Sequence, residues 1–225
     1  MSAQAAPQSG RGPYSSPRQE ERQRRILDVA RQEISRVGYD AITMQALAVA
    51  AGVSTKTLYN LYGSKDELLL AAVAELLGNL EQKTEVDSAE AGIPRLLAFT
   101  GVVFAQVVSA PRYAEVMART LFQANPGQRL VEILLGNTLR LTRQALQAEQ
   151  AAGGLIASAD VAALAEQLAA NQWGLILLWS KGIVALQGLE QQALRGQVLA
   201  LLPLCSEARG KSLQGLLRAM ESSGA

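Results

Sequence analysis

The stretch that decides the fold is residues 44–61, MQALAVAAGVSTKTLYNL. Two short helices can cross at a tight turn only if the residues at the crossing are small, apolar or able to adopt a positive φ. Ala48 is small where the second helix must approach, Gly52 lies where the turn needs a left-handed backbone, and Val53 can fill the space beneath it. The other positions that would face the shared core are Leu47, Ala51, Leu58 and Leu61. The spacing therefore predicts a helix-turn-helix.

The second helix of this pair has a polar outer face. Its outward residues are Ser54, Thr55, Lys56, Thr57, Tyr59 and Asn60. They offer hydrogen-bond donors and acceptors, one cation and one aromatic ring but no carboxylate, as a surface that approaches DNA phosphates requires. The alternative is an ordinary helical hairpin with a glycine turn, which shares part of this pattern.

Composition limits the classes of function. The chain has 225 residues, 49% of them apolar and 18% charged, which predicts one or two globular domains. It has no histidine and one cysteine, Cys205, so imidazole metal sites, His-dependent catalytic dyads and an intramolecular disulfide are excluded. We expect no metal site and no cofactor. Because the sequence has no apolar run of membrane-spanning length and no apolar signal core at its N-terminus, we also expect a cytoplasmic protein with no membrane contact.

Charge is distributed unevenly along the chain. Residues 1–65 contain nine Lys or Arg and five Asp or Glu, whereas residues 66–225 contain twelve and fifteen. A basic N-terminal part followed by an acidic remainder favours a small polyanion-binding head on a different kind of body.

Apolar periodicity and the positions of glycine and proline predict an all-α protein in three parts. These are a disordered tail over residues 1–17, a helix-turn-helix domain of three helices over residues 18–65, and a larger helical domain over residues 66–225. Ser64 and Glu67 form a capping box for a helix that extends towards Lys83. Later helices are predicted to open at Pro94 and Pro111, to end at Gly153, and to cover residues 160–186, 190–205 and 211–222.

Residues 26–69 resemble the DNA-binding domain of the TetR family of bacterial transcriptional regulators. The resemblance is carried by Val37-Gly38-Tyr39, Thr43, Leu47-Ala48, Ala51-Gly52-Val53-Ser54, Thr57-Leu58-Tyr59 and Ser64-Lys65-Asp66-Glu67-Leu68. It covers about a fifth of the chain, and its spacing and identities agree across four predicted helices. The all-helical remainder has the length that the family requires.

The resemblance implies roles for individual residues in the head. The expected phosphate contacts are Thr43, Tyr59 and Lys65. The expected major-groove readers are Thr55, Lys56, Thr57 and Asn60. Among these, Asn60 can pair with adenine and Lys56 with guanine. Ser54 and Gln45 complete the expected DNA-binding set, although Gln45 stands where many members of the family have Arg.

For the body, the resemblance implies a ligand pocket and a homodimer. The expected ligand-binding residues are Phe99, Phe104, Tyr113, Met117, Phe122 and Trp173, with ordinary core packing as the alternative for each. The predicted helix over residues 160–186 is apolar almost all round and is expected to pair with residues 190–205 in a two-fold interface; the central helix of a monomer is the alternative. Trp173 and Trp179 are about 120° apart around its axis, so one should face the pocket and the other the interface.

The sequence thus predicts a ligand-responsive transcriptional regulator of double-stranded DNA, in the family's commoner mode a repressor. A small apolar or amphipathic effector would release it from a palindromic operator, and the helix that begins at Ser64 would join pocket to head. Two other classes are weighed against it. An enzyme is disfavoured because Gly210-Lys211-Ser212 lacks the preceding glycine of a phosphate-binding loop. A helical ligand-binding or scaffold protein that does not bind DNA remains the alternative.

Overall fold

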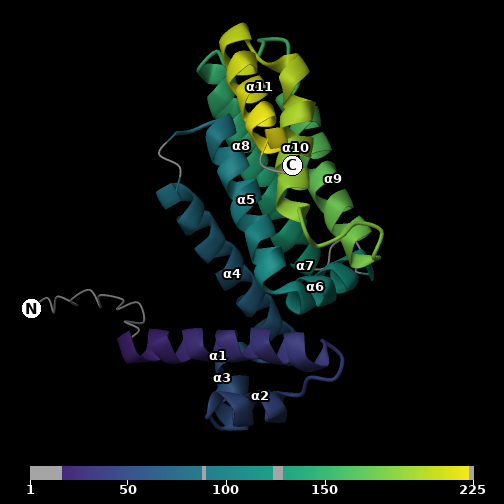
Figure 1. Ribbon diagram of the computed structural model, residues 1–225. Coiled ribbons are helices and arrows are strands. Elements are labelled where there is room, and N and C mark those ends of the chain that lie inside the picture. Colours follow the sequence, from purple (N-terminus) through teal and green to yellow (C-terminus); the bar gives the residue numbers. More distant parts are fainter. Residues whose placement is uncertain (1–16, 88–89, 124–128, 223–225) are drawn as a thin grey trace, which may run out of the picture.

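The protein folds as a bundle of helices with a small head at one end (Figure 1). The computed structural model describes residues 17–87, 90–123 and 129–222, and within them it contains helices and no strand. The elements are α1 (Pro17–Val37), α2 (Met44–Ala51), α3 (Thr55–Tyr62), α4 (Lys65–Asp87), α5 (Ile93–Ser109), α6 (Pro111–Gln123), α7 (Arg129–Val131), the π-helical turn η1 (Glu132–Gly136), α8 (Asn137–Ala151), α9 (Val161–Ser180), α10 (Leu189–Leu201), the 3₁₀ turn η2 (Leu202–Leu204) and α11 (Glu207–Ser222). The predicted all-α class is confirmed. The predicted tail lies outside the described residues, except for Pro17.

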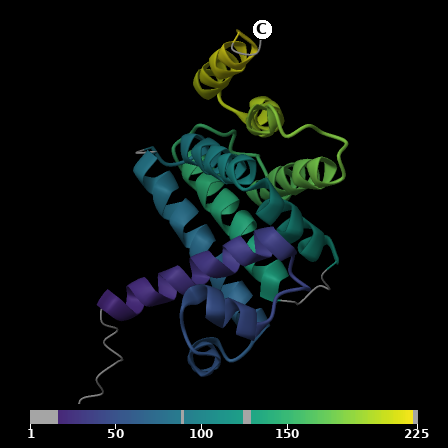
Figure 2. The same cartoon turned by 60° about the horizontal axis from the view of Figure 1, so that its bottom comes forward.

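The head consists of α1, α2 and α3, and α1 lies across the start of α4 (Figures 1 and 2). Ala48 is 2% exposed, and the Val53 N–H donates a hydrogen bond to its carbonyl oxygen at 3.0 Å. Gly52 has φ +65°, in the left-handed region. The predicted helix-turn-helix is therefore confirmed at Ala48 and Gly52, whereas Val53 and Leu61 are only half-buried.

Side chains cap the starts of α2, α3 and α4, and the cap at Ser64 belongs to the predicted capping box. Thr43 Oγ1 accepts a hydrogen bond from the Ala46 N–H, Ser54 Oγ from the Thr57 N–H, and Ser64 Oγ from the Glu67 N–H, each at 3.1 Å. These bonds satisfy backbone donors that a helix leaves free at its first turn. The Glu67 carboxylate pairs instead with Arg129, and so links α4 to α7.

In the body, α5 packs against α4, α8 and α10, and α9 lies between α8 and α10 (Figure 1). One core cluster runs from the head into the body without a break. Its buried members include Ile26 and Ile34 of α1, Leu69 of α4, and Tyr113 and Met117 of α6. The predicted boundary between residues 65 and 66 thus separates two segments that share one core.

Several helix boundaries differ from those predicted. The helix expected over residues 160–186 ends at Ser180, because Gly182 adopts φ +73° and the Ile183 N–H turns back to the Leu178 carbonyl at 3.0 Å. Pro203 lacks an N–H, and α10 gives way to a 3₁₀ turn there rather than reaching Cys205. The expected long helix ending at Gly153 is divided by the π-helical turn η1.

The buried carboxylate of Glu149 holds helices of the body together at the end away from the head. Glu149 on α8 is 2% exposed, accepts a hydrogen bond from the Ile93 N–H at 2.8 Å, and pairs with Arg209 Nε of α11 at 2.6 Å. Gly154 lies so close that a Cβ there would fall 1.6 Å from a Glu149 carboxylate oxygen. The contact ties together α5, α8 and α11.

Within the described residues, no single helix combines the length and the apolarity needed to cross a membrane. Only α5 and α6 taken together reach them, and they meet at a bend of 109°.

We predict opposite effects of adding a methyl group at two exposed glycines. Gly52→Ala should lower the free energy of unfolding by about 1 kcal/mol, because its left-handed backbone disfavours a Cβ. Gly78→Ala, inside α4 with open space around it, should raise that free energy by about 0.5–1 kcal/mol. Urea unfolding measures the free energy of unfolding of both variants. If Gly78→Ala also loses stability, the left-handed turn at Gly52 is not the cause of the loss in Gly52→Ala.

Candidate DNA-binding surface and ligand cavity

Helix α3 lies at the end of the molecule opposite α11 (Figure 1). It carries the predicted reading residues. Lys56, Tyr59 and Asn60 are exposed and Thr55 is half-buried, whereas Leu58 is fully buried beneath them. Thr43 and Gln45, at the start of α2, are also exposed. The side chains that would meet a duplex are thus accessible, and that they contact DNA stays a prediction.

Two of the predicted contacts are already engaged with each other. Ser54 Oγ lies 2.9 Å from Thr57 Oγ1 and also caps α3 through the Thr57 N–H. Their hydroxyls therefore fix the first turn of α3. Accessible polar groups remain on Thr55, Lys56 and Asn60, which have no hydrogen bond among the described residues.

Tyr39 holds Lys65 against the head, a structural role that the sequence pattern did not predict. Lys65 Nζ donates to the Tyr39 carbonyl at 3.3 Å and lies 4.9 Å from the centroid of the Tyr39 ring. The Tyr39 hydroxyl donates to Asp66 Oδ1 at 2.6 Å, and burial, followed by this bond, raises the pKa of Tyr39. The contacts fix the ammonium group of Lys65 beside the start of α4.

Arg31 joins α1 to α4. Its Nη1 donates to the Ala72 carbonyl at 2.9 Å and to Glu75 Oε2 at 2.7 Å, and its other nitrogen pairs with Asp28. Burial alone would lower the pKa of Arg31, but the hydrogen bonds to Glu75 and Asp28 raise it above its usual value. The orientation of the head on α4 thus depends on a charged, partly buried contact.

An apolar cavity lies between α4, α5, α6, α8 and α9, bounded also by η1. Its enclosed space is about 90 Å³, and the empty volume that includes its open mouth is about 710 Å³. Its lining residues are Val73, Leu76, Leu77, Leu80, Phe99, Val103, Gln106, Val107, Tyr113, Ala114, Met117, Ala118, Leu134, Thr138, Gln172, Trp173 and Ile176.

Four of the six predicted ligand-binding residues line this cavity: Phe99, Tyr113, Met117 and Trp173. Phe104 does not, because it is fully buried in a separate core cluster with residues of α9 and α10. Phe122 does not either, because Leu121 takes the inward position on α6 and leaves Phe122 43% exposed. The sequence did not predict that residues of α4 line the cavity. The apolar run around Leu76 and Leu77 could have indicated it.

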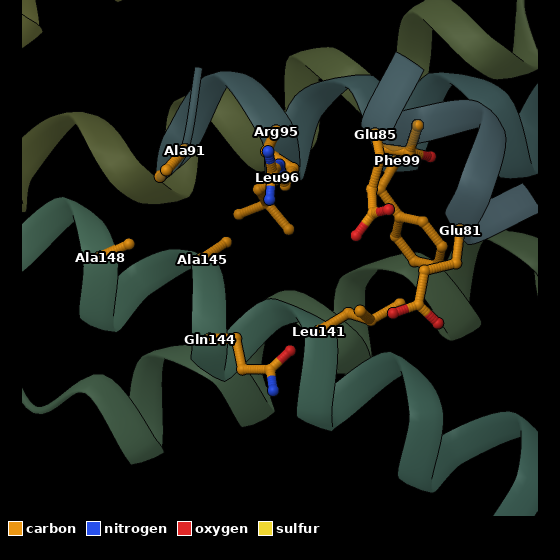
Figure 3. A pocket seen from close by; sticks show the side chains of 12 residues that line it. Glu81, Glu85, Ala91, Arg95, Leu96, Phe99, Leu141, Gln144, Ala145 and Ala148 are labelled. Carbon is orange, nitrogen blue, oxygen red and sulfur yellow. The ribbon is translucent and has the colours of Figure 1, made fainter. Parts of the chain in front are cut away.

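A second, more polar cavity lies on the other side of Phe99, between α4, α5 and α8 (Figure 3). Glu81, Glu85, Arg95 and Gln144 contribute its polar side chains. Glu81 is paired with Arg140 at 3.0 Å. Arg95 Nε is buried without a hydrogen-bond partner among the described residues.

Helix α9 places its two tryptophans differently. Trp173 lines the apolar cavity, which agrees with one half of the prediction for this pair. Trp179 packs beside the cluster around Phe104. On the same stretch, Leu178 is 40% and Ile183 is 70% exposed in the single chain. A face that carries exposed leucine and isoleucine is compatible with the expected dimer interface, which stays a prediction.

The structure presents a helix-turn-helix with an accessible α3 on a larger helical body. Residues 26–72 match the family of bacterial regulatory proteins described as tetR. The chain is 33% identical to the transcriptional repressor KstR of Mycolicibacterium smegmatis over 109 residues, which are 48% of this chain and 53% of KstR. It is 35% identical over 74 residues to the regulator BetI of Rhizobium meliloti, covering 33% of this chain and 36% of BetI. The chain thus matches about half the length of KstR.

Solved structures share the fold over most of their length. A TetR-family regulator from Rhodococcus sp. has a TM-score of 0.67 at 19% identity, covering 80% of this chain and 98% of that one. FadR of Bacillus subtilis, crystallised with stearoyl-CoA, has a TM-score of 0.65 at 22% identity, covering 76% and 95%. At these identities the solved structures show the likeness of fold, and residues 26–72 are the part of the chain that matches the tetR family of bacterial regulatory proteins.

We predict that Arg31→Met loosens the head from α4. Methionine keeps the apolar stem but removes the charged bonds to Glu75 and the Ala72 carbonyl, so the free energy of unfolding should fall by about 2 kcal/mol. Arg36→Met is the matched control, because Arg36 pairs only with Glu33 on the exposed side of the same helix. Equal stability of both variants in urea unfolding would contradict a role for Arg31 in holding the two parts together.

Proposed function

We propose that the protein is a homodimeric transcriptional repressor that binds an operator through α3 and is released by a small ligand in the apolar cavity. The observation that carries the proposal is the double role of α4. The same helix supplies Leu76 and Leu77 to the cavity wall and Glu75 to the contact with Arg31 of the head. The named repressor KstR supports the regulatory mode, and the solved complex of SmeT with triclosan supports an apolar effector.

On DNA, the exposed side of α3 would enter the major groove. Asn60 would pair with adenine and Lys56 with guanine, while Thr43, Tyr59 and Lys65 would contact phosphates. α3 carries no acidic residue in its first turn, so its free N–H groups also favour an anion there. A regulator of this kind acts in the cytoplasm, where the chromosomal DNA lies.

Ligand binding would act through α4. An effector that fits better when α4 is displaced would favour a dimer in which the two α3 helices no longer match the half-site spacing. A tenfold loss of operator affinity requires about 1.4 kcal/mol of differential binding between the two states. Two-fold pairing through α9 and α10 would present both α3 helices to a near-palindromic site.

The test of DNA binding begins with a selection of bound fragments from random DNA, which supplies the operator. Lys56→Ala should then lower operator affinity about 10–100-fold, because it removes a base contact worth about 1–3 kcal/mol. Tyr59→Phe should lower it by less and equally for all sequences, because it removes a phosphate contact. Fluorescence anisotropy at several salt concentrations measures both.

Lys211→Ala is the control for this series, since Lys211 lies on α11 and pairs only with Glu207. It should bind the operator like the unmodified protein. Unchanged affinity in Lys56→Ala and Tyr59→Phe would instead favour the scaffold protein that does not bind DNA.

We predict that Leu178→Asp converts the dimer to monomers. Leu178 is exposed in the single chain, so the substitution should leave the folded protomer intact, whereas a carboxylate buried at the interface without a partner should weaken association at least 100-fold. Sedimentation velocity measures the change, with Leu216→Asp on α11 as the control for an exposed leucine elsewhere. If the Leu178→Asp protein is still a dimer, or if only Leu216→Asp disrupts the dimer, the interface does not include Leu178.

A further inference from the structure

The side chains that line the apolar cavity are uncharged. Its polar members are Gln106, Tyr113, Thr138, Gln172 and Trp173, and no Asp, Glu, Lys or Arg lines it within the described part of the chain. Burial raises the pKa of Tyr113 to about 12, so its hydroxyl stays neutral near pH 7. A charged group moved from water into this space would find no counter-charge, and its lost hydration would oppose binding.

One residue of α9 offers an unused hydrogen-bonding group to the cavity. Gln172 is 4% exposed, lines the cavity, and its side-chain amide has no hydrogen bond among the residues described. Trp173 Nε1 also has no partner within that part of the chain, but it is buried with almost no accessible surface, so a ligand oxygen in the cavity does not reach it. Thr138 is different again, because its hydroxyl already donates to the Leu134 carbonyl at 2.9 Å. Buried polar groups are normally paired, and a ligand oxygen that accepted from Gln172 would supply the missing partner.

The Tyr113 hydroxyl is likewise unpartnered among the described residues, but it too is buried with almost no accessible surface. Gln106 of α5 also lines the cavity and is less buried than Gln172. We therefore assign recognition of the ligand oxygen to Gln172 and not to Tyr113.

The polar cavity beyond Phe99 offers no net positive charge to an acidic ligand. Glu81 is neutralised by Arg140, and this leaves Glu85 and Arg95, whose charges are opposite. Glu85 and Phe99 both line this cavity (Figure 3), so an anion that extended past Phe99 would meet a carboxylate there. The unpartnered Arg95 Nε is the one feature that would attract an anion, and the experiment below includes that outcome.

We infer that the effector is an uncharged, largely hydrophobic molecule with a carbonyl or hydroxyl oxygen that accepts a hydrogen bond from the Gln172 amide. The inference rests on the proposed function, whose ligand it specifies. Fatty acids and other hydrophobic anions are excluded from the effector class by the same argument.

The test compares three probes of one chain length: methyl nonyl ketone, its secondary alcohol, and undecanoate. Binding is followed by tryptophan fluorescence in the Trp179→Phe variant, where Trp173 is the only indole left of the two in the sequence. The ketone and the alcohol should bind at least tenfold more tightly than undecanoate at pH 7. Undecanoate binding as tightly as the ketone, or no binding of either neutral probe, would overturn the inference.

A second arm locates the recognition residue. Gln172→Leu should lower ketone affinity about tenfold, which corresponds to about 1.4 kcal/mol, because it removes the amide but keeps an apolar lining. Gln167→Leu is the matched control on the same helix, since Gln167 is exposed and bonds to Asn171 at 3.0 Å. Thermal unfolding confirms that both variants fold. Unchanged ketone binding in Gln172→Leu would contradict the assignment to this residue.

Operator binding is measured separately in the presence of each probe. If the ketone binds as predicted but operator affinity is unchanged, the ligand class stands and the proposed regulation fails. If only undecanoate weakens operator binding, the regulation stands and the ligand class is wrong.

Discussion

Helix α4 is packed on both sides, and the rest of the molecule depends on that constraint. Buried residues of α4, among them Leu69 and Val73, belong to one cluster with Ile26 and Ile34 of α1 and Met117 of α6. Because the interior is close-packed, a displacement on one side of α4 cannot be absorbed without a shift on the other. The head and the body are thus mechanically linked through apolar packing, with Arg31 adding a directional, charged contact.

Prediction from the sequence succeeded where local chemistry decides the structure. Gly52, Ala48 and the capping residues each have a requirement that depends only on nearby backbone, so the head could be derived from one chain. Helix ends at Ser180 and near Pro203 were placed too late, because apolar periodicity continued past the residues that stop the helix.

The candidate cavity was harder to derive because it is made by elements far apart in the sequence. Aromatic content on α5 and α6 identified Phe99 and Tyr113, but periodicity could not show that Phe104 turns towards α10 while Phe122 turns to solvent. The wall formed by α4, and the position of Gln172 on α9, depend on how five helices pack together. Such packing is not encoded by the spacing of residues within any one of them.

The buried carboxylate of Glu149 has a consequence for how this body can vary among related proteins. Its two oxygens occupy the space where side chains at residues 92 and 154 would begin, and its charge is balanced by Arg209. A neutral residue at 149 would leave Arg209 without its counter-ion, and any side chain at 154 would collide with the carboxylate. These four positions, which span three separate regions of the chain, should therefore be inherited or replaced together, as a covarying set that alignments of such sequences would reveal.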